Sequence, residues 1–262
     1  MIVEDDPGDV PPEVESAEDV VLVVQLFDTT QMRRTARDSG DSLWDLESTV
    51  GDTFTLVNGQ YNPTLEITAG EWQRWRVVFA SWDENPLDLS MITNGVCEMN
   101  LLAKDGIYIN DYPRPLTFYP ISTAGRADIM VRCSETGSFA VEDYLGDLFT
   151  LNVVAPDGPI DVSTPPTSGF QFPTPLYLND LQGRIPTPGC TCDTTLAGNQ
   201  VNGLSYDPDI FVHKVAEGSL VQRNLRGIST HPYHRKCNLT LMNLGYYLYK
   251  ELKISLFATV LL

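Results

Sequence analysis

Short apolar segments separated by turn dipeptides fill the first 155 residues, and this pattern most constrains the fold. Segment 53–57 is followed by Asn58-Gly59, and segment 98–103 by Asp105-Gly106. Such pairs favour β-hairpin turns, because the central residues of these turns need a positive φ. Further strand signals lie at 20–27, 65–68, 74–79, 127–132, 138–142 and 148–155. Many short strands with turns between them predict an all-β sandwich.

The charge is strongly acidic and unevenly distributed. The 262 residues include 35 acids and 17 bases, which gives a net charge of −18. This excess argues against a nucleic-acid-binding protein that neutralises phosphates. Residues 1–50 hold thirteen acids and three bases, whereas residues 213–262 hold two acids and seven bases. The chain therefore changes character near its end.

Two segments have the composition of linkers. Residues 4–18 are acidic and contain three prolines, and residues 156–192 contain eight. Both are expected to be solvated connections. After the second linker, Gln200-Val201-Asn202-Gly203 echoes Leu56-Val57-Asn58-Gly59. The echo indicates two copies of one sandwich type, and a chance recurrence of Asn-Gly is the alternative.

No targeting or membrane segment is visible in this sequence. Acidic residues follow Met1 almost at once, where a signal peptide would carry basic residues and then an apolar run. The apolar run 254–262 is shorter than the roughly 20 residues that span a bilayer. We expect no membrane span.

The three histidines are His213, His231 and His234. His231-Pro232-Tyr233-His234 places two imidazoles three residues apart, and neutral imidazole suits copper, zinc and iron. Taken alone, the pair is also compatible with histidines that bind no metal.

Five cysteines leave at least one without a partner in a monomer. Cys97 and Cys133 lie at the edges of expected strands, where either a disulfide or two buried thiols is possible. Cys190-Thr191-Cys192 is either half of a metal site or a pair of linker cysteines.

Several motifs, in their order and spacing, resemble the middle domain of multicopper oxidases of the laccase and bilirubin-oxidase-like group. The resemblance rests on the following segments: Leu56-Val57-Asn58-Gly59-Gln60, Leu65-Glu66-Ile67, Arg74-Trp75-Arg76, Leu102-Ala103-Lys104-Asp105-Gly106 and Gly125-Arg126-Ala127-Asp128. In addition, Ile2-Val3-Glu4-Asp5-Asp6 looks like the end of a preceding domain. The stretch from Asn202 to His234 looks like the start of a third domain.

The resemblance implies a cupredoxin-like Greek-key β-sandwich, with one complete and one partial copy. It divides the chain as follows: 1–17 is the end of a preceding domain and an acidic linker, 18–155 the middle domain, 156–192 a Pro-rich linker, 193–235 a partial third domain, and 236–262 a divergent tail. We expect that tail to be foreign sequence, from a frameshift or an unspliced intron, because the acidic composition gives way to a basic one there.

The resemblance also assigns two copper ligands. The family motif reads His-Pro-Phe/Tyr-His-x-His, so His231 corresponds to a ligand of the mononuclear copper and His234 to a ligand of the trinuclear cluster. The third histidine is replaced by Lys236, whose ammonium group must lose a proton before it can bind a metal. Three histidines cannot supply both centres, so both are expected to be incomplete and the chain alone inactive.

The implied function is copper-dependent oxidation of a small-molecule or metal-ion substrate, with reduction of dioxygen to water. By family analogy the protein is secreted or extracytoplasmic. The alternative is a non-catalytic cupredoxin-like module that has lost its copper sites and serves a structural or interaction role.

Overall fold

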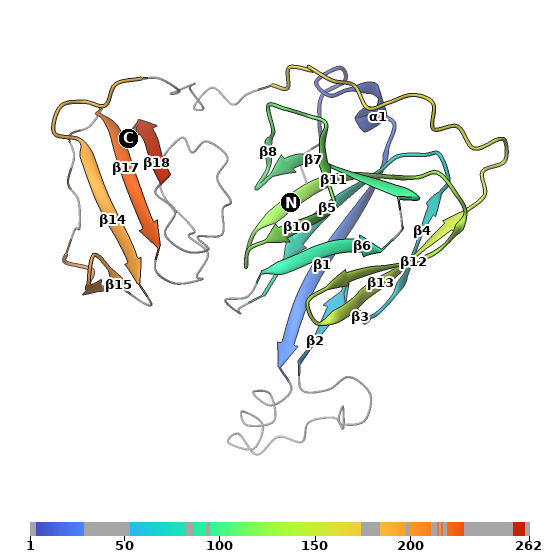
Figure 1. Ribbon diagram of the computed structural model, residues 1–262, viewed down its shortest axis with the longest axis horizontal. Helices are drawn as coiled ribbons and strands as arrows, with labels where there is room; N and C mark the ends of the chain where they lie inside the picture. Colours follow the sequence, from blue (N-terminus) through green and yellow to red (C-terminus); the bar gives the residue numbers. More distant parts are fainter. Residues whose placement is uncertain are drawn as a thin grey trace, which may run out of the picture. The chain divides into compact units, whose positions relative to one another are not determined.

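The structure is a computed structural model, and it consists of two compact units, Met1–Pro173 and Thr174–Leu262 (Figure 1). The structure describes residues 4–28, 53–81, 86–92, 95–173, 184–197, 200–210, 214, 216, 219–227 and 254–259.

The first unit contains two β-sheets. Sheet A has the strand order β3 (Gln60–Tyr61), β2 (Thr53–Val57), β1 (Glu18–Asp28), β5 (Gln73–Phe79), β11 (Arg126–Cys133), β7 (Cys97–Lys104) and β8 (Ile107–Tyr108), and β9 (Arg114–Leu116) also pairs with β7. Sheet B has the order β10 (Phe118–Ile121), β6 (Leu87–Ile92), β12 (Gly137–Asp143), β13 (Gly146–Val154) and β4 (Thr64–Thr68). The β1–β5 and β13–β4 pairs are parallel. These crossed connections confirm the prediction of an all-β, cupredoxin-like sandwich.

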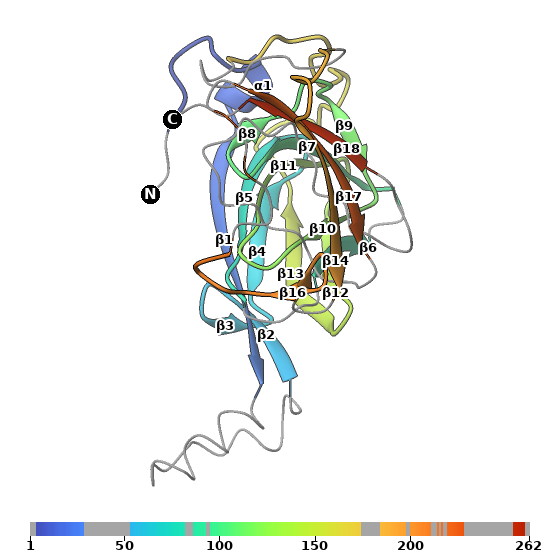
Figure 2. The same cartoon turned by 90° about the vertical axis from the view of Figure 1, so that its left-hand side faces the viewer.

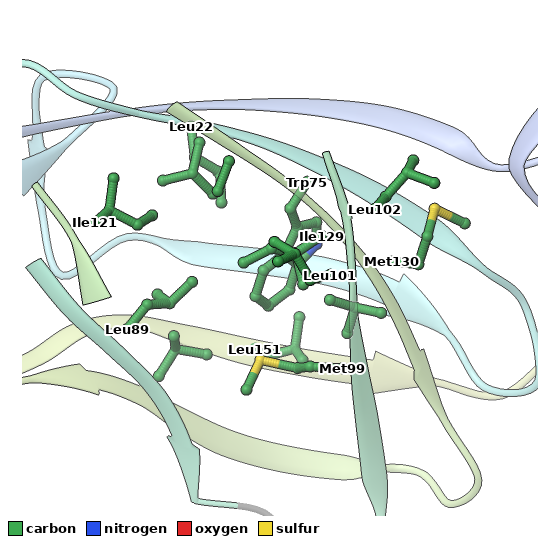
Figure 3. Close-up of a cluster of buried hydrophobic side chains, with 14 of the residues drawn as sticks. Leu22, Trp75, Leu89, Met99, Leu101, Leu102, Ile121, Ile129, Met130 and Leu151 are labelled. Atoms are coloured by element: carbon green, nitrogen blue, oxygen red, sulfur yellow. The ribbon is translucent and has the colours of Figure 1, made fainter. Parts of the chain in front are cut away.

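The hydrophobic core lies between sheets A and B, which form separate layers in the turned view (Figure 2). Side chains from both sheets converge there, with Leu22, Trp75 and Ile129 from sheet A and Leu89 and Leu151 from sheet B (Figure 3). The Trp75 ring meets the Phe149 ring edge to face at 5.4 Å between centroids. Trp75, Val77 and Phe79 share one buried face of β5, as their period-two spacing predicts.

The N-terminal segment, residues 4–17, packs against this sandwich. It includes the short helix α1 (Pro12–Glu15), and Val10 and Val14 are buried in the same core cluster as the sheets. The composition of this segment predicts a solvated linker, and most of its residues are indeed exposed or partly exposed, but Val10 and Val14 are 5% and 4% exposed and belong to the core cluster. The acidic composition of the segment gives no indication that these two valines are buried.

The Pro-rich stretch after β13 also contacts the sandwich, and we call residues 156–173 the strap. The carbonyl oxygen of Thr164 accepts a hydrogen bond from Arg132, and the Phe172 ring stacks on Tyr108 at 4.5 Å between centroids. The strap passes close to Gly70, where an added Cβ would lie 3.1 Å from the backbone of Asp161. Much of the strap's surface is exposed, but its anchoring contacts make it part of the first unit.

The second unit contains Sheet C, with the order β16 (Leu204–Ser205), β15 (Gln200–Val201), β14 (Thr191–Ala197), β17 (Leu220–Gly227) and β18 (Ile254–Thr259). The β14–β17 pair is parallel, and the other pairs in this sheet are antiparallel. Strand β14 begins two residues before the expected boundary at 193. Strand β18 pairs with β17 and belongs to the segment 236–262 that the sequence marks as divergent.

The echo of Asn-Gly in the sequence corresponds to the same turn in both units. Asn58 has φ 51° and Asn202 has φ 53°. The Oδ1 of Asn58 accepts a hydrogen bond from the backbone N–H of Val23 at 2.8 Å, and that of Asn202 accepts one from Thr195 at 2.6 Å. In each case Nδ2 donates to a carbonyl two residues earlier on the same strand, at 2.9 and 3.1 Å. This geometric match favours a structural repeat over a chance dipeptide.

Candidate functional site

The expected copper ligands His231 and His234 lie outside the described residues, and so do His213, Lys236 and Cys237. The last described residue before them is Gly227, at the end of β17, so the histidine motif follows this strand by four residues. The assignment of the two histidines as copper ligands therefore stays a prediction.

The described part of the chain does not itself match a copper centre of the implied kind. None of the three histidines is within it, and it contains no group of three or more His, Cys, Asp or Glu side chains arranged to hold a metal ion. No chemical step can be derived through copper from these residues. What they do supply is a scaffold with two charged clusters, a disulfide and a pair of free thiols.

Cys97 and Cys133 form a disulfide bond. The two residues lie directly opposite each other in the register of β7 and β11, with a Cα–Cα distance of 4.0 Å. Cys133 is completely buried. The bond joins neighbouring strands of Sheet A near the end of the sheet where the strap passes, because Ser134 follows Cys133 and Thr164 of the strap contacts Arg132.

Arg74 is the centre of a buried charged cluster on the outer face of Sheet A. Its Nη2 lies 2.6 Å from the Asp128 carboxylate, and its Nη1 lies 2.6 Å from the Asp5 carboxylate. It also donates to the hydroxyl oxygen of Tyr108 at 3.0 Å, and that hydroxyl donates in turn to Asp5. The Arg74 side chain is only 6% exposed, so the cluster ties the N-terminal segment to β5 and β11.

The pKa values in this cluster follow from burial opposed by pairing. Burial alone would raise the pKa of Asp5, but hydrogen bonds from Tyr108 and Arg74 bring it below its usual value of 3.8. Burial would lower the pKa of Arg74, but Asp128 and Asp5 raise it. Burial and the hydrogen bond to Asp5 both raise the pKa of Tyr108. All three groups therefore keep one protonation state at neutral pH, which suits a fixed ionic support rather than acid–base catalysis.

A second arginine anchors the strap. Arg132 Nη2 lies 2.6 Å from the Glu98 carboxylate, and its guanidinium lies 4.4 Å from the centroid of the Trp72 ring. Its Nη1 donates to the Thr164 carbonyl at 2.8 Å. The strap and the N-terminal segment are joined to each other as well, because Glu13 accepts hydrogen bonds from the backbone N–H and the hydroxyl of Thr167.

Sequence reasoning identified Arg74 and Asp128 as motif residues but missed that they bind each other and Asp5. The alternation of residues in 74–79 predicts that Arg74 and Arg76 lie on the face of the strand opposite Trp75. Nothing in this alternation indicates that Arg74 contacts Asp5, which lies 69 residues earlier in the chain.

Cys190 and Cys192 are free thiols and are both buried. They form a small hydrophobic cluster with Val221 of β17.

In the described part of the chain, no helix is long and apolar enough to cross a membrane.

Several multicopper oxidases are among the solved structures that resemble this chain. The enzyme from Pseudomonas thermotolerans is 20% identical, with a TM-score of 0.57 over 93% of this chain and 61% of its own. A laccase-like CueO from Ochrobactrum sp. is 15% identical, with a TM-score of 0.60 over 93% of this chain and 60% of its own. A variant of McoA from Aquifex aeolicus is 17% identical, with a TM-score of 0.60 over 94% and 60%. No family model and no curated protein sequence matches the chain.

These likenesses define the class of fold. The chain has the cupredoxin-like, all-β fold of multicopper oxidases, as the resemblance of its motifs predicts. It spans about three fifths of the length of the three solved structures named above.

Proposed function

We propose that this chain is part of a multicopper-oxidase-like protein that oxidises a reducing substrate and passes the electrons to dioxygen, which is reduced to water. The substrate is a small molecule or a metal ion. The observation that carries the proposal is the likeness to multicopper oxidases over 93% of the chain, across both units and not the sandwich alone. The motifs that resemble the middle domain of that family support it independently.

His231 and His234 are the proposed copper ligands, for the mononuclear centre and the trinuclear cluster respectively. Copper bound there would supply one-electron redox chemistry. The chain's own contribution is positional: β17 pairs with β14 and β18, and the motif follows its last residue, Gly227, after three intervening residues. Lys236 stands where a third histidine, a ligand of the trinuclear cluster, is expected. The three histidines of this chain are too few for the two centres, so both are proposed to be incomplete and the chain alone inactive.

We propose an extracytoplasmic location for the protein. Support comes from the Cys97–Cys133 disulfide, because disulfides form and persist in oxidising compartments and are rare in the reducing cytosol.

The test measures Cu(II) binding by the purified chain with electron paramagnetic resonance, which detects Cu(II) and not Cu(I). The wild-type chain should bind Cu(II) with nitrogen ligands, and the double substitution His231→Ala and His234→Ala should abolish that signal. His213→Ala is the matched control, since it removes the one other imidazole and should leave the signal unchanged.

Oxygen uptake is measured on the same samples with a phenolic reductant, and none is expected from the chain alone. Cu(II) binding that survives the double substitution would overturn the ligand assignment. Absence of Cu(II) binding by the wild-type chain would favour the non-catalytic module. Oxidase turnover by this chain would overturn the proposed inactivity.

A further inference from the structure

Two free thiols occupy the buried side of the second unit. Cys190 is 9% exposed and Cys192 is 7% exposed, and with Val221 they make up a hydrophobic cluster of their own. Exposure alternates through this stretch, with Thr191 and Asp193 exposed between buried neighbours. The two thiols therefore project from the same face of an extended chain.

The spacing of the two cysteines disfavours a disulfide between them. Cys190 directly precedes β14: its N–H donates to the Thr187 carbonyl at 2.9 Å, which closes a turn, and its carbonyl accepts a hydrogen bond from the Gln222 N–H at 2.9 Å. Alternate residues of a strand lie about 6.6 Å apart with their Cβ atoms pointing the same way, whereas a disulfide needs a Cβ–Cβ distance near 3.8 Å. The two sulfurs of a disulfide lie only about 2.0 Å apart. A metal ion bound between two sulfurs allows a larger sulfur–sulfur distance, up to about 4.6 Å for metal–sulfur bonds of about 2.3 Å. Rotation about χ1 can bring two such side chains into that range.

The donor set selects the kind of metal. Thiolates favour soft cations such as Cu(I) and zinc. Structural zinc takes four ligands, but the described residues offer no third His, Cys, Asp or Glu that joins this pair in a group. Cu(I), a soft ion with a filled d shell, is stable with two thiolate ligands and accepts a buried apolar setting.

We propose that Cys190 and Cys192 form a two-coordinate Cu(I) site in the second unit. Binding converts two thiols and one Cu(I) ion into a bis-thiolate complex with one negative charge and releases two protons, with no change in oxidation state. The site goes beyond the proposed function and uses neither His231 nor His234.

The corresponding strand of the first unit argues that the fold does not require thiols here. Val23 and Thr195 make equivalent hydrogen bonds to Asn58 and Asn202, so Cys190, which directly precedes β14, corresponds to Glu18 of β1, and Cys192 of β14 corresponds to Val20. Glu18 is exposed, and Sheet A forms with a carboxylate at that position. The position of Cys190 therefore does not require a small apolar side chain, whereas that of Cys192 corresponds to Val20, which is apolar and packs against the core of the first unit. Neither position requires a thiol, so the dithiol is particular to the second unit.

The test is an anaerobic titration of the chain with Cu(I) in competition with a chromophoric Cu(I) chelator, with the Cys97–Cys133 disulfide left intact and the other thiols reduced. We expect tight uptake of one Cu(I) per chain, a near-ultraviolet sulfur-to-copper absorption, and X-ray absorption with sulfur as the sole ligand type. Cys190→Ser and Cys192→Ser should each lose the tight uptake. Cys237→Ser is the matched thiol control, and the combined His231→Ala and His234→Ala variant is the imidazole control. Both should keep it.

Buried serines can unfold the second unit, so Cys192→Val, which keeps an apolar side chain of similar size, is titrated alongside with circular dichroism as a fold check. Uptake that persists in folded Cys192→Val, or a wild-type spectrum with nitrogen ligands, would overturn the site. Loss of the Cu(II) signal of the histidine motif with this Cu(I) uptake intact would count against the proposed function alone.

Discussion

Five strands of Sheet A have the same order as the five described strands of Sheet C, but the described residues of the two units pack against these strands differently. In Sheet A the order β3-β2-β1-β5-β11 has a parallel pair at its centre, and Sheet C repeats this order as β16-β15-β14-β17-β18. Asn58 and Asn202 make equivalent side-chain hydrogen bonds at equivalent turns. In the first unit Sheet B, the N-terminal segment and the strap all pack on Sheet A. In the second, the cluster within the described residues consists of Cys190, Cys192 and Val221.

The comparison of the two units distinguishes the residues that form the sheet from the residues that stabilise it. Turn residues and strand pairing are local, and they recur in both units. Burial of apolar surface needs a second layer, and it supplies most of the free energy of folding. The first unit should therefore owe most of its stability to the side chains that join its layers.

The largest expected effect is at Trp75, which is completely buried between Sheets A and B. Trp75→Ala should lower the free energy of unfolding of the first unit by about 3–5 kcal/mol, because it removes the largest core side chain and leaves a cavity. All four tryptophans lie in the first unit, so urea unfolding followed by tryptophan fluorescence reports on that unit alone.

The matched control for Trp75 is Val221→Ala in the smaller cluster, which should leave the fluorescence transition unchanged. A loss below about 1 kcal/mol for Trp75→Ala would contradict the layered account of the first unit.

The next effect distinguishes the two cysteine pairs. Cys97 and Cys133 are joined, whereas Cys190 and Cys192 are free. Reduction should destabilise the first unit by about 2–4 kcal/mol, because the bond restricts the unfolded chain. The measurement is the fluorescence transition with and without dithiothreitol. The Cys97→Ala and Cys133→Ala double variant should show the reduced midpoint under both conditions, and a residual response of that variant to dithiothreitol would assign the effect elsewhere.

A third effect concerns the outer face of Sheet A. Arg74→Met should cost about 2–3 kcal/mol, because it removes the cation that Asp5 and Asp128 share; this is less than for a fully buried pair, since their side chains are 22% and 16% exposed. Arg114→Met is the control, since the Arg114–Asp111 pair is exposed and should contribute at most about 1 kcal/mol. Equal costs for the two variants in urea unfolding would show that the Arg74 cluster is not a buried support.

The fourth prediction tests the repeat directly. Asn58→Ala and Asn202→Ala should each cost their own unit about 1–2 kcal/mol, because each loses two hydrogen bonds and forces alanine to a positive φ. Fluorescence reports the first unit, and labelling of Cys190 and Cys192 by a thiol reagent in the Cys237→Ser background reports the second. Asn58→Gly, which tolerates the positive φ, separates the strain from the hydrogen bonds. Clearly unequal costs would reduce the repeat to a shared turn sequence.

The sequence predicts the strands and the repeated turn because those are written in neighbouring residues. The period-two pattern of 74–79 correctly places Trp75 in the core, and Asn-Gly correctly marks both turns. The sequence does not predict that residues 4–17 and the strap pack on Sheet A. Those contacts join Asp5 to Arg74 and Glu13 to Thr167, which are 69 and 154 residues apart. The composition of both segments predicts solvated linkers, because a few anchoring side chains hardly change the average polarity of a mostly polar segment.

The smallest expected effect is the pH dependence that Asp5 adds to the first unit. Its pKa is lowered in the folded state, so its ionised form binds Arg74 and Tyr108 more favourably than water. This contribution is present above the ordinary pKa of 3.8 and is lost as the pH falls through the lower folded value. Asp5→Asn should therefore flatten the fall in stability of the first unit below about pH 4. The measurement is the urea midpoint from tryptophan fluorescence between neutral pH and pH 3. Asp6→Asn is the neighbouring control and should keep the wild-type profile. If Asp5→Asn also kept that profile, the contact of Asp5 with Arg74 would contribute nothing to stability, and Val10, Val14 and the hydrogen bonds of Glu13 would hold the N-terminal segment.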